Sequence, residues 1–330
     1  MNADEIFKRC EHDLQMVEEE LVNIFRSDVR FIPMIGKHLL KGGGKRIRPL
    51  YLLLSAELAG YGQDLRYHFA GVVEAIHTAS LLHDDVVDGA DVRRGRPTSH
   101  SIWGNQIVIL VGDFLFANAL RLAVEQKNLM IIETLSKATA EMTEGEILQL
   151  QRINDPAITE EEYLGIIAAK TGALISAACT IGGLLGGLPE EKIRALAGYG
   201  LKTGIVFQMF DDVLDFNADE AKLGKRLGKD LHEGKITLPL IYLLKDVNDA
   251  ERDMITEIIK SSDTKKGAKK LDSGLKNILK LFKKYNAIEN TINKAARIID
   301  EAKAELDLFE DSPQKDTMLT MADYALMRKK

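Results

Sequence analysis

Two short acidic motifs are the residues of this sequence best suited to chemistry. The chain reads HDDVVD at 83–88 and DDVLD at 211–215, so the first and last Asp of each DDxxD stretch are four residues apart. On a helix, that spacing places both carboxylates on one face, where like charges repel by about 0.2–0.5 kcal/mol. Paired carboxylate oxygens suit Mg²⁺, which completes its ligand set with water and phosphate oxygens. The two motifs therefore predict a magnesium site for a phosphorylated ligand.

Both motifs stand where apolar helical stretches are expected to end, before Gly89 and before Asn217. The negative end of a helix dipole opposes each carboxylate there by about 0.3–1 kcal/mol, so we expect a cation between the motifs. Two unrelated, solvated helix ends would be the simpler interpretation. Apolar flanking residues such as Leu82, Phe207 and Phe210 favour a cavity wall instead.

Basic residues that could face the far oxygens of a phosphorylated ligand also occur in clusters. A Gly42–Gly44 turn precedes Lys45 and Arg48 and can open a helix whose free amides attract an anion. It is not a nucleotide P-loop, because Arg46 stands where Ser or Thr would be required. His77 lies two helical turns before the first motif and could reach the same ligand. Further candidates along the chain are Arg93, Arg94, Lys170, Lys225, Lys229 and Lys235.

The elements that position these residues are predicted to be helices throughout. The seven prolines delimit long blocks in which apolar residues recur every three or four positions. We find no β-branched run bounded by hairpin turns, so no sheet is expected. With no Ser/Gly linker and no repeat, the sequence predicts an all-α fold with a single domain over residues 1–330.

Composition narrows the class of protein. The chain has 330 residues, 45% of them hydrophobic, a net charge of −6 and two cysteines. Enough apolar surface is available for a core, and the acidic balance argues against a nucleic-acid binder. Isolated cysteines and an acidic N-terminal segment favour the cytoplasm over export. The uncharged stretch at 171–189 is rich in Gly, so we interpret it as a closely packed core helix and not as a membrane span.

Taken together, these motifs resemble the trans-isoprenyl diphosphate synthases, or polyprenyl synthetases, and in particular their medium- and long-chain members. The matching stretches are GGGKRIRP at 42–49, LLHDDVVDGADVRRGRPT at 81–98, GDFLFANA at 112–119, KTGAL at 170–174, FQMFDDVLDF at 207–216 and GKITLPLI at 234–241. The resemblance implies a single-domain helical bundle around a deep central cavity, usually a homodimer, with the acidic motifs facing each other across its mouth. It also implies head-to-tail condensation of isopentenyl diphosphate with an allylic diphosphate, assisted by about three Mg²⁺ ions.

The same resemblance assigns roles to individual residues. Direct metal ligands would be Asp84, Asp88 and Asp211, supported by Asp85, Asp212 and Asp215. The allylic diphosphate would be held by Arg93, Lys170 and Lys225, and isopentenyl diphosphate by Lys45, Arg48, His77 and Arg94. Thr171 and Gln208 would line the reacting end, and Lys235 would lie near the leaving group.

Product length is expected to depend on the turn before the first motif. Short-chain members often carry a bulky side chain there, whereas this chain has Ala79 and Ser80. Small residues leave a passage open, so we expect an all-trans product of about C40, within roughly C30 to C50, of the kind used for quinone side chains. The lysine-rich segment at 260–284 would allow at most a peripheral contact with anionic membrane during product release.

Several alternatives remain open at this stage. The enzyme could make shorter geranylgeranyl or farnesyl products, or the chain could be a non-catalytic subunit of a heteromeric synthase. A class I terpene cyclase would share the first motif, but its second metal motif is of a different type. Glu74 and His77 fit one ExxH pair of a di-iron bundle, which would need a second such pair.

Overall fold

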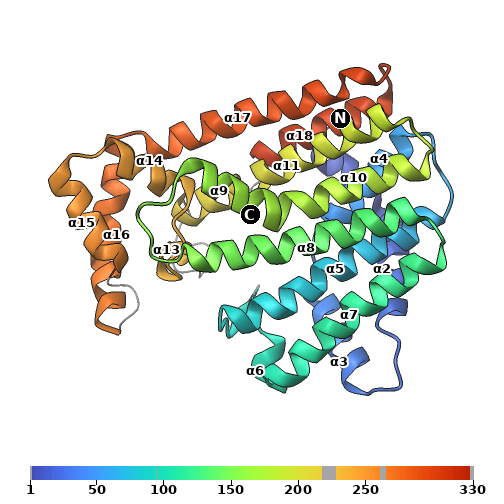
Figure 1. Cartoon of the computed structure of the whole chain (residues 1–330), viewed down its shortest axis with the longest axis horizontal. Coiled ribbons are helices and arrows are strands. Elements are labelled where there is room, and N and C mark those ends of the chain that lie inside the picture. Colours follow the sequence, from blue (N-terminus) through green and yellow to red (C-terminus); the bar gives the residue numbers. More distant parts are fainter. Residues whose placement is uncertain (1, 94, 218–227, 261–264, 328–330) are drawn as a thin grey trace. The chain divides into compact units, whose positions relative to one another are not determined.

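The computed structural model of the protein describes residues 2–93, 95–217, 228–260 and 265–327, with side chains described for all of these except 217 and 265–273. The described chain is almost entirely helical, which confirms the all-α prediction (Figure 1). The N-terminal part contains α1 (Ala3–Arg9), α2 (Glu11–Ile24), α3 (Phe31–Lys41), α4 (Ile47–Leu58), α5 (Leu65–Val87), β1 (Val92–Arg93), β2 (Arg96–Pro97), α6 (Ser99–Trp103), α7 (Asn105–Glu125) and α8 (Leu129–Gln151). It is followed by α9 (Glu160–Ile167), the π-turn η1 (Ala168–Gly172), α10 (Ala173–Leu185), α11 (Glu190–Asn217), α13 (Lys229–His232), α14 (Leu238–Asp246), α15 (Asp249–Lys260), α16 (Lys265–Lys284), α17 (Ala287–Glu305), η2 (Leu306–Leu308) and α18 (Pro313–Met327).

The chain packs into two compact units. The first comprises Met1–Ala140, Leu174–Gly200 and Glu305–Met321, and the second comprises Glu141–Ala173, Leu201–Ala304 and Ala322–Lys330. The acidic motif at 83–88 belongs to the first unit and the motif at 211–215 to the second. Each unit is described by itself below, and the single domain stays a prediction.

In the first unit, α5 is the central helix and packs against α2, α4 and α7 (Figure 1). Its core also contains two fully buried tyrosines whose rings meet edge to face, Tyr51 and Tyr199, with centroids 6.1 Å apart. Their hydroxyl groups donate hydrogen bonds to the carbonyl oxygens of Met321 and Met318 in the middle of α18. A buried Tyr normally needs such an acceptor, so these two bonds tie α18 to α4 and α11.

The glycine-rich stretch forms a buried helix, as the sequence predicts. A Cβ atom on Gly182 would lie 2.6 Å from the Cβ of Ser55, and one on Gly186 would lie 2.3 Å from the Cβ of Ala59. Gly182 lies on α10 and Gly186 directly follows it, so the two glycines let the end of this helix approach the end of α4 more closely than any side chain would allow.

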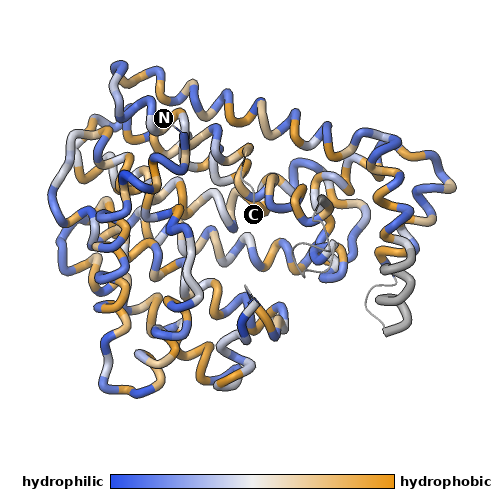
Figure 2. The backbone as a smooth tube through the Cα atoms, turned by 180° about the vertical axis from the view of Figure 1, so that it is seen from behind, coloured by the Kyte–Doolittle hydropathy of each residue, from blue (hydrophilic) through white to orange (hydrophobic). Residues whose placement is uncertain are grey.

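The second unit owes its helices to clear local signals. Thr159 and Glu162 form a capping box at the start of α9, and Pro239 occupies the first turn of α14. Phe216 near the end of α11 meets Phe282 of α16 edge to face, with ring centroids 4.9 Å apart. Hydrophobic and hydrophilic residues alternate along α17, as expected for a helix with one buried side (Figure 2).

One sequence-based expectation needs correction. The chain does form a sheet, although a minimal one: Val92 pairs with Pro97 and Arg93 with Arg96 in an antiparallel hairpin. The hairpin forms because Gly95 can adopt a φ of 73° in the turn, and strands of two residues do not require a run of β-branched side chains. Of the lysine-rich segment at 260–284, Lys260 ends α15 and residues 265–284 form α16.

Two stretches of the described chain are long and apolar enough to cross a membrane by length and composition, Asn105–Glu125 and Glu160–Leu185. Core helices of globular proteins pass the same test. The second stretch fits that explanation, with 61% of its apolar window buried, whereas only 33% of the α7 window is buried. α7 therefore exposes much more apolar surface than a core helix.

Candidate active site

The first acidic motif ends α5, whose two sides differ in burial. The middle of the helix is mostly buried, whereas seven residues from position 77 to position 88 are half-buried and Val87 is exposed. Five of the half-buried residues share one face through spacings of three and four residues, namely His77, Ser80, Leu81, Asp84 and Asp88. We call this stripe the open face of α5. Its last turn carries the two outer carboxylates of the motif.

α5 stops directly after the motif because of a glycine turn. Gly89 has a φ of 60°, a conformation that suits glycine. The Gly89 and Ala90 amides donate to the carbonyl oxygens of Val86 and Asp85, at 3.3 and 3.0 Å, which is the Schellman arrangement of helix ends. As predicted, the carboxylates therefore lie at the negative end of the helix dipole, where a cation would be favoured.

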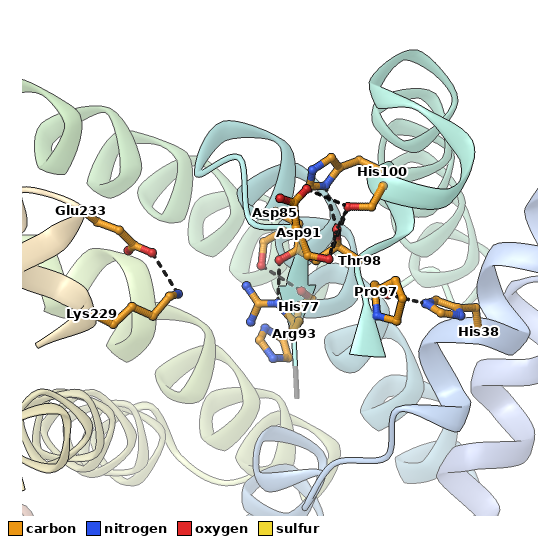
Figure 3. A network of polar contacts seen from close by, with 12 residues as sticks. His38, His77, Asp85, Asp91, Arg93, Pro97, Thr98, His100, Lys229 and Glu233 are labelled. Atoms are coloured by element: carbon orange, nitrogen blue, oxygen red, sulfur yellow. Dashed lines mark hydrogen bonds and ion pairs between the residues drawn. The ribbon is translucent and has the colours of Figure 1, made fainter. Parts of the chain in front are cut away.

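The middle carboxylate of this motif points inward. Asp85 is 3% exposed and accepts a hydrogen bond of 2.6 Å from the Nε of Arg93, which β1 presents (Figure 3). The Arg93 side chain is 38% exposed, so the ion pair fixes a guanidinium group that still reaches solvent. Such a held guanidinium is suited to gripping a phosphate.

Packing against α7 decides which residues of α5 share the face of the motif. A Cβ atom on Gly112 would lie 2.3 Å from the Nε2 of His83, so the glycine makes room for this ring. Ala79 stands one turn before His83, on the side that packs on α7, and is fully buried. Ser80 stands one turn before Asp84 and is half-buried on the open face. A side chain at position 112 would collide with the His83 ring, which explains why the GDFLFANA stretch begins with glycine.

The loop before α4 is anchored by a buried ion pair. Arg46 has a φ of 48° and directly precedes α4. Its Nε donates to Glu18 at 2.5 Å, and its Nη1 donates to Glu74 at 3.0 Å. The side chains of Arg46 and Glu74 are 9% and 6% exposed. Arg46 therefore holds the loop in place.

This anchor leaves the neighbouring basic residues nearer to solvent. Lys45 is exposed and Arg48 is half-buried, both at the start of α4. Burial raises the pKa of Glu74, while the Arg46 and Arg48 charges oppose that rise. Because Glu74 is engaged with Arg46, it is not available as a metal ligand, which removes the structural basis of the di-iron alternative.

In the second unit, the candidate Lys170 lies in η1, a π-turn between α9 and α10. Such turns are rare and often occur at functional sites. The Nζ of Lys170 lies 2.5 Å from a carboxylate oxygen of Glu146 and donates a hydrogen bond to Gln149, both on α8. The next residue, Thr171, donates its hydroxyl hydrogen to the side-chain oxygen of Gln208 at 2.9 Å. The structure thus joins Thr171 and Gln208, two candidates that are far apart in the sequence.

The middle carboxylate of the second motif is also turned inward. Asp212 is 3% exposed, and its two oxygens accept hydrogen bonds from Gln208 at 2.8 Å and from Tyr163 at 2.7 Å. Burial raises the pKa of Asp212 well above its usual range, the Asp230 carboxylate adds to the rise, and these two hydrogen bonds oppose it. Tyr163 was missed by sequence reasoning, because a lone Tyr in an apolar helix reads as a core residue.

A further carboxylate extends the acidic cluster. The backbone amide of Asp230 donates to Asp215 at 3.0 Å. Burial raises the pKa of Asp230 to about 7, and the Asp215 charge contributes to this rise. Lys235 lies 2.8 Å from Glu233, and its side chain is 13% exposed. Asp215 and Asp230 thus lie close together, and the Asp215 charge disfavours the ionised form of Asp230.

These side chains surround a cavity of about 110 Å³. It is lined by Gln149, Arg152, Ile158, Tyr163, Ile166, Ile167, Lys170, Gln208, Asp212, Asp230, Lys235, Ile236 and Thr237. Three cationic side chains share it with two carboxylates, so the cavity can accommodate anionic and cationic groups together.

The predicted site residues thus fall into two groups. The first unit contains Lys45, Arg48, His77, Ala79, Ser80, Asp84, Asp85, Asp88 and Arg93, and the second contains Lys170, Thr171, Gln208, Asp211, Asp212, Asp215 and Lys235. Arg94 and Lys225 lie outside the described residues. Within the described ranges, no group of three or more His, Cys, Asp or Glu side chains has the arrangement of a metal site. That the two motifs face each other stays a prediction.

Comparison with known proteins identifies the family. Residues 30–275 match the polyprenyl synthetase family model. The octaprenyl diphosphate synthase of Escherichia coli (strain K12) is 37% identical over 328 residues, which cover 99% of each chain. A decaprenyl diphosphate synthase from Rhodobacter capsulatus has the same fold, with a TM-score of 0.90, 38% identity and 98% coverage of both chains. A polyprenyl synthase from Caulobacter crescentus, complexed with calcium and isoprenyl diphosphate, gives a TM-score of 0.91 and 38% identity over 98% of this chain and 97% of that one.

The family match covers both acidic motifs and most of the basic candidates, and it confirms the resemblance drawn from the sequence. It also answers the terpene-cyclase alternative, because the matched model and these relatives are polyprenyl synthases. The chain is a prenyltransferase and belongs to the polyprenyl synthetase family.

Proposed function

We propose that this prenyltransferase joins isopentenyl diphosphate head-to-tail to an allylic diphosphate and repeats the step to make an all-trans polyprenyl diphosphate. The observation that carries the proposal is the open face of α5, where Asp84 and Asp88 stand above the small side chain of Ser80. A diphosphate bound at the carboxylate end would direct its hydrocarbon tail along this face. Asp84 and Asp88 would thus bind the charged diphosphate through a metal ion, and the face below them would accommodate the hydrocarbon tail.

Members of this family use a divalent metal ion. We infer that the ion is Mg²⁺, about three per site, held by Asp84, Asp88 and Asp211. The donor set fits, because all three are carboxylates near the end of a helix, and hard oxygen ligands of this kind suit Mg²⁺. When bound, the metal would neutralise charge on the departing diphosphate.

The basic side chains would complete diphosphate binding. Arg93 is already fixed by Asp85, and Lys170 by Glu146, so each presents its charge with little loss of side-chain freedom on binding. With Lys225 they would hold the allylic diphosphate, and Lys235 would lie beside the leaving group. Lys45, Arg48, His77 and Arg94 would hold isopentenyl diphosphate.

The chemical step needs charge stabilisation and a dry pocket more than a side-chain base. The allylic carbon–oxygen bond breaks, both electrons leave with the diphosphate, and cationic side chains stabilise that charge. The double bond of isopentenyl diphosphate then attacks the allylic cation, and the released diphosphate accepts the proton that is lost. The apolar side chain of Leu81 on the open face of α5 would help to keep water from the cation.

We propose an octaprenyl product, about C40, for use in a quinone side chain. The support is the small side chain of Ser80 below Asp84 and the octaprenyl and decaprenyl synthases among the relatives. Geranylgeranyl or farnesyl products are the alternative.

A homodimer is proposed from the exposed side of α6 and α7. Ile102, Ile109, Leu110 and Val124 are 47%, 39%, 65% and 51% exposed. An apolar surface of this kind is typical of a protein interface, and a second copy of this chain would cover it. Light scattering should give the mass of a dimer, and Leu110→Glu should give a monomer. Val29→Glu, a matched change at a residue 60% exposed, should leave the dimer intact.

We infer a cytoplasmic enzyme with at most peripheral membrane contact. Cys10 and Cys179 are both buried free thiols, as expected for a reducing compartment. Exposed lysines on α16, namely Lys276, Lys280 and Lys283, would attract anionic lipid during product release.

The test is a product analysis. The purified chain receives Mg²⁺, labelled isopentenyl diphosphate and farnesyl diphosphate, and the extracted prenyl alcohols are sized. Polyprenols near C40 support the proposal. Asp84→Asn should abolish them, and Asp28→Asn, at an exposed residue, should not. Recovery of farnesol alone would indicate a non-catalytic subunit, and activity would then appear only after a second subunit is added.

A further inference from the structure

One buried tyrosine beside the second acidic motif has no role in the function proposed above. Tyr163 on α9 is 4% exposed, and its hydroxyl group donates to an oxygen of Asp212 at 2.7 Å. Burial raises the pKa of Tyr163 well above 10, and the Asp212 charge contributes to this rise. A phenol that stays protonated is a permanent hydrogen-bond donor.

The tyrosine is one end of a continuous set of hydrogen bonds. The hydroxyl of Thr171 donates to the Gln208 oxygen at 2.9 Å, the Gln208 amide donates to one Asp212 oxygen at 2.8 Å, and Tyr163 donates to the other. Every donor in this series points toward Asp212. The series joins three elements, α9, η1 and α11.

These bonds constrain three parts of the candidate site that are far apart in the sequence. With both oxygens of Asp212 occupied from inside the unit, α11 cannot rotate about its axis without breaking a buried bond. This constraint also fixes the orientation of the half-buried residues Asp211 and Asp215, which lie on the same helix. The same series fixes Thr171 and so its neighbour Lys170 in the π-turn.

We propose that Tyr163 is a positioning residue that orients the second acidic motif and Lys170 for a metal-bound diphosphate. It acts through Asp212 and Gln208 and does not itself touch the substrate. This inference rests on the proposed function, because it assumes that Asp211 binds the metal. Outer partners of metal ligands typically change metal affinity or activity by about 10- to 100-fold when removed.

The deciding variant is Tyr163→Phe, which removes one oxygen and keeps the ring. We expect its half-saturating Mg²⁺ concentration to rise about 10-fold or more, with a fall in kcat. Binding of Mn²⁺ in the presence of inorganic pyrophosphate, measured by electron paramagnetic resonance, should weaken in parallel and requires no turnover. Tyr285→Phe removes a hydroxyl bonded to Glu251 and is the matched control, for which neither quantity should change.

Coupling distinguishes positioning from simple loss of stability. In a double-mutant cycle with Gln208→Leu, the effects on Mn²⁺ affinity should be less than additive, since both bonds serve the same carboxylate. A Tyr163→Phe protein that melts earlier but binds Mn²⁺ like the wild type at 25 °C would overturn the proposal. Fully additive effects would overturn it as well. If wild-type protein makes no polyprenol but the Mn²⁺ difference persists, the proposed reaction fails and the positioning role stands.

Discussion

Replacing Arg46 by Ala should destabilise the first unit strongly, because it leaves a carboxylate buried without its ion-pair partner. The Arg46 and Glu74 side chains are 9% and 6% exposed and lie 3.0 Å apart. Removing one partner of a buried pair costs about 3–5 kcal/mol, whereas an exposed pair contributes at most about 1 kcal/mol. Arg9→Ala is the matched control, since Arg9 and Glu57 lie 3.2 Å apart with side chains 33% and 36% exposed.

The loss should also depend on pH, with a defined sign. Burial raises the pKa of Glu74, and Arg46 opposes that rise, so Arg46→Ala should raise the pKa further. For a carboxyl whose pKa is raised by folding, stability is greatest below the unfolded value of about 4.3 and is lost as pH rises through the folded value. The destabilisation by Arg46→Ala should therefore be larger at pH 8 than at pH 5.

Urea unfolding followed by circular dichroism at both pH values measures this. Adding Glu74→Gln to Arg46→Ala should remove the pH dependence, because the titrating group is gone. If Arg46→Ala lowers the free energy of unfolding by less than about 1 kcal/mol at pH 8, the pair contributes no more than a surface ion pair and the reasoning is refuted. Equal losses of stability at pH 5 and pH 8 would also refute it. The loop also presents Lys45 and Arg48, so the variant should raise KM for isopentenyl diphosphate more than KM for the allylic substrate.

Three further outcomes are expected. Ser80→Phe should shorten the product, because the ring fills the open face one turn below Asp84. Ala79→Tyr should also shorten the product, and it should lower the melting temperature because Ala79 is fully buried. Prenyl alcohols of unchanged length would contradict both expectations. Neither cysteine should react with a thiol reagent in the folded protein, because burial raises the pKa of Cys179 to about 12 and that of Cys10 above its usual value; rapid labelling before unfolding would contradict this. Gly234→Ala should cost about 1–3 kcal/mol in urea unfolding, since Gly234 has a φ of 75° and the new Cβ would lie 2.5 Å from Asn154, and an unchanged midpoint would argue against that contact.

The helix ends were predictable from the sequence because each depends on local chemistry. Gly89 ends α5 through its left-handed conformation, and the four-residue spacing of aspartates sets their face whatever the partner helices are. Likewise, the uncharged, glycine-rich stretch predicted α10, since only small residues permit its approach to α4. Each of these signals sets the backbone conformation or the direction of a side chain from residues within one or two helical turns.

Contacts between distant segments were not predictable in the same way. Nothing in the sequence around Arg46 indicates a partner for its charge, and only the fold reveals its bonds to Glu18 and Glu74. Tyr163 lies 49 positions from Asp212, and no spacing rule connects them. The hairpin at Arg93 depends on the left-handed Gly95, for which the sequence offered one glycine and no strand pattern. In each case the missing information is which segments pack together.

The two acidic motifs share one construction but differ in the donor that holds the middle carboxylate. In each, the outer aspartates lie on a half-buried face and the middle one is buried and held by the protein. Asp85 is held by a cation, Arg93, which cancels its charge, whereas Asp212 is held by the neutral donors Tyr163 and Gln208. A charged donor and a neutral donor can both fix the direction of a carboxylate, but only the charged one also favours its ionised form. Replacing the donor should therefore change the ionisation of Asp85 more directly than that of Asp212, whose pKa is already raised by burial.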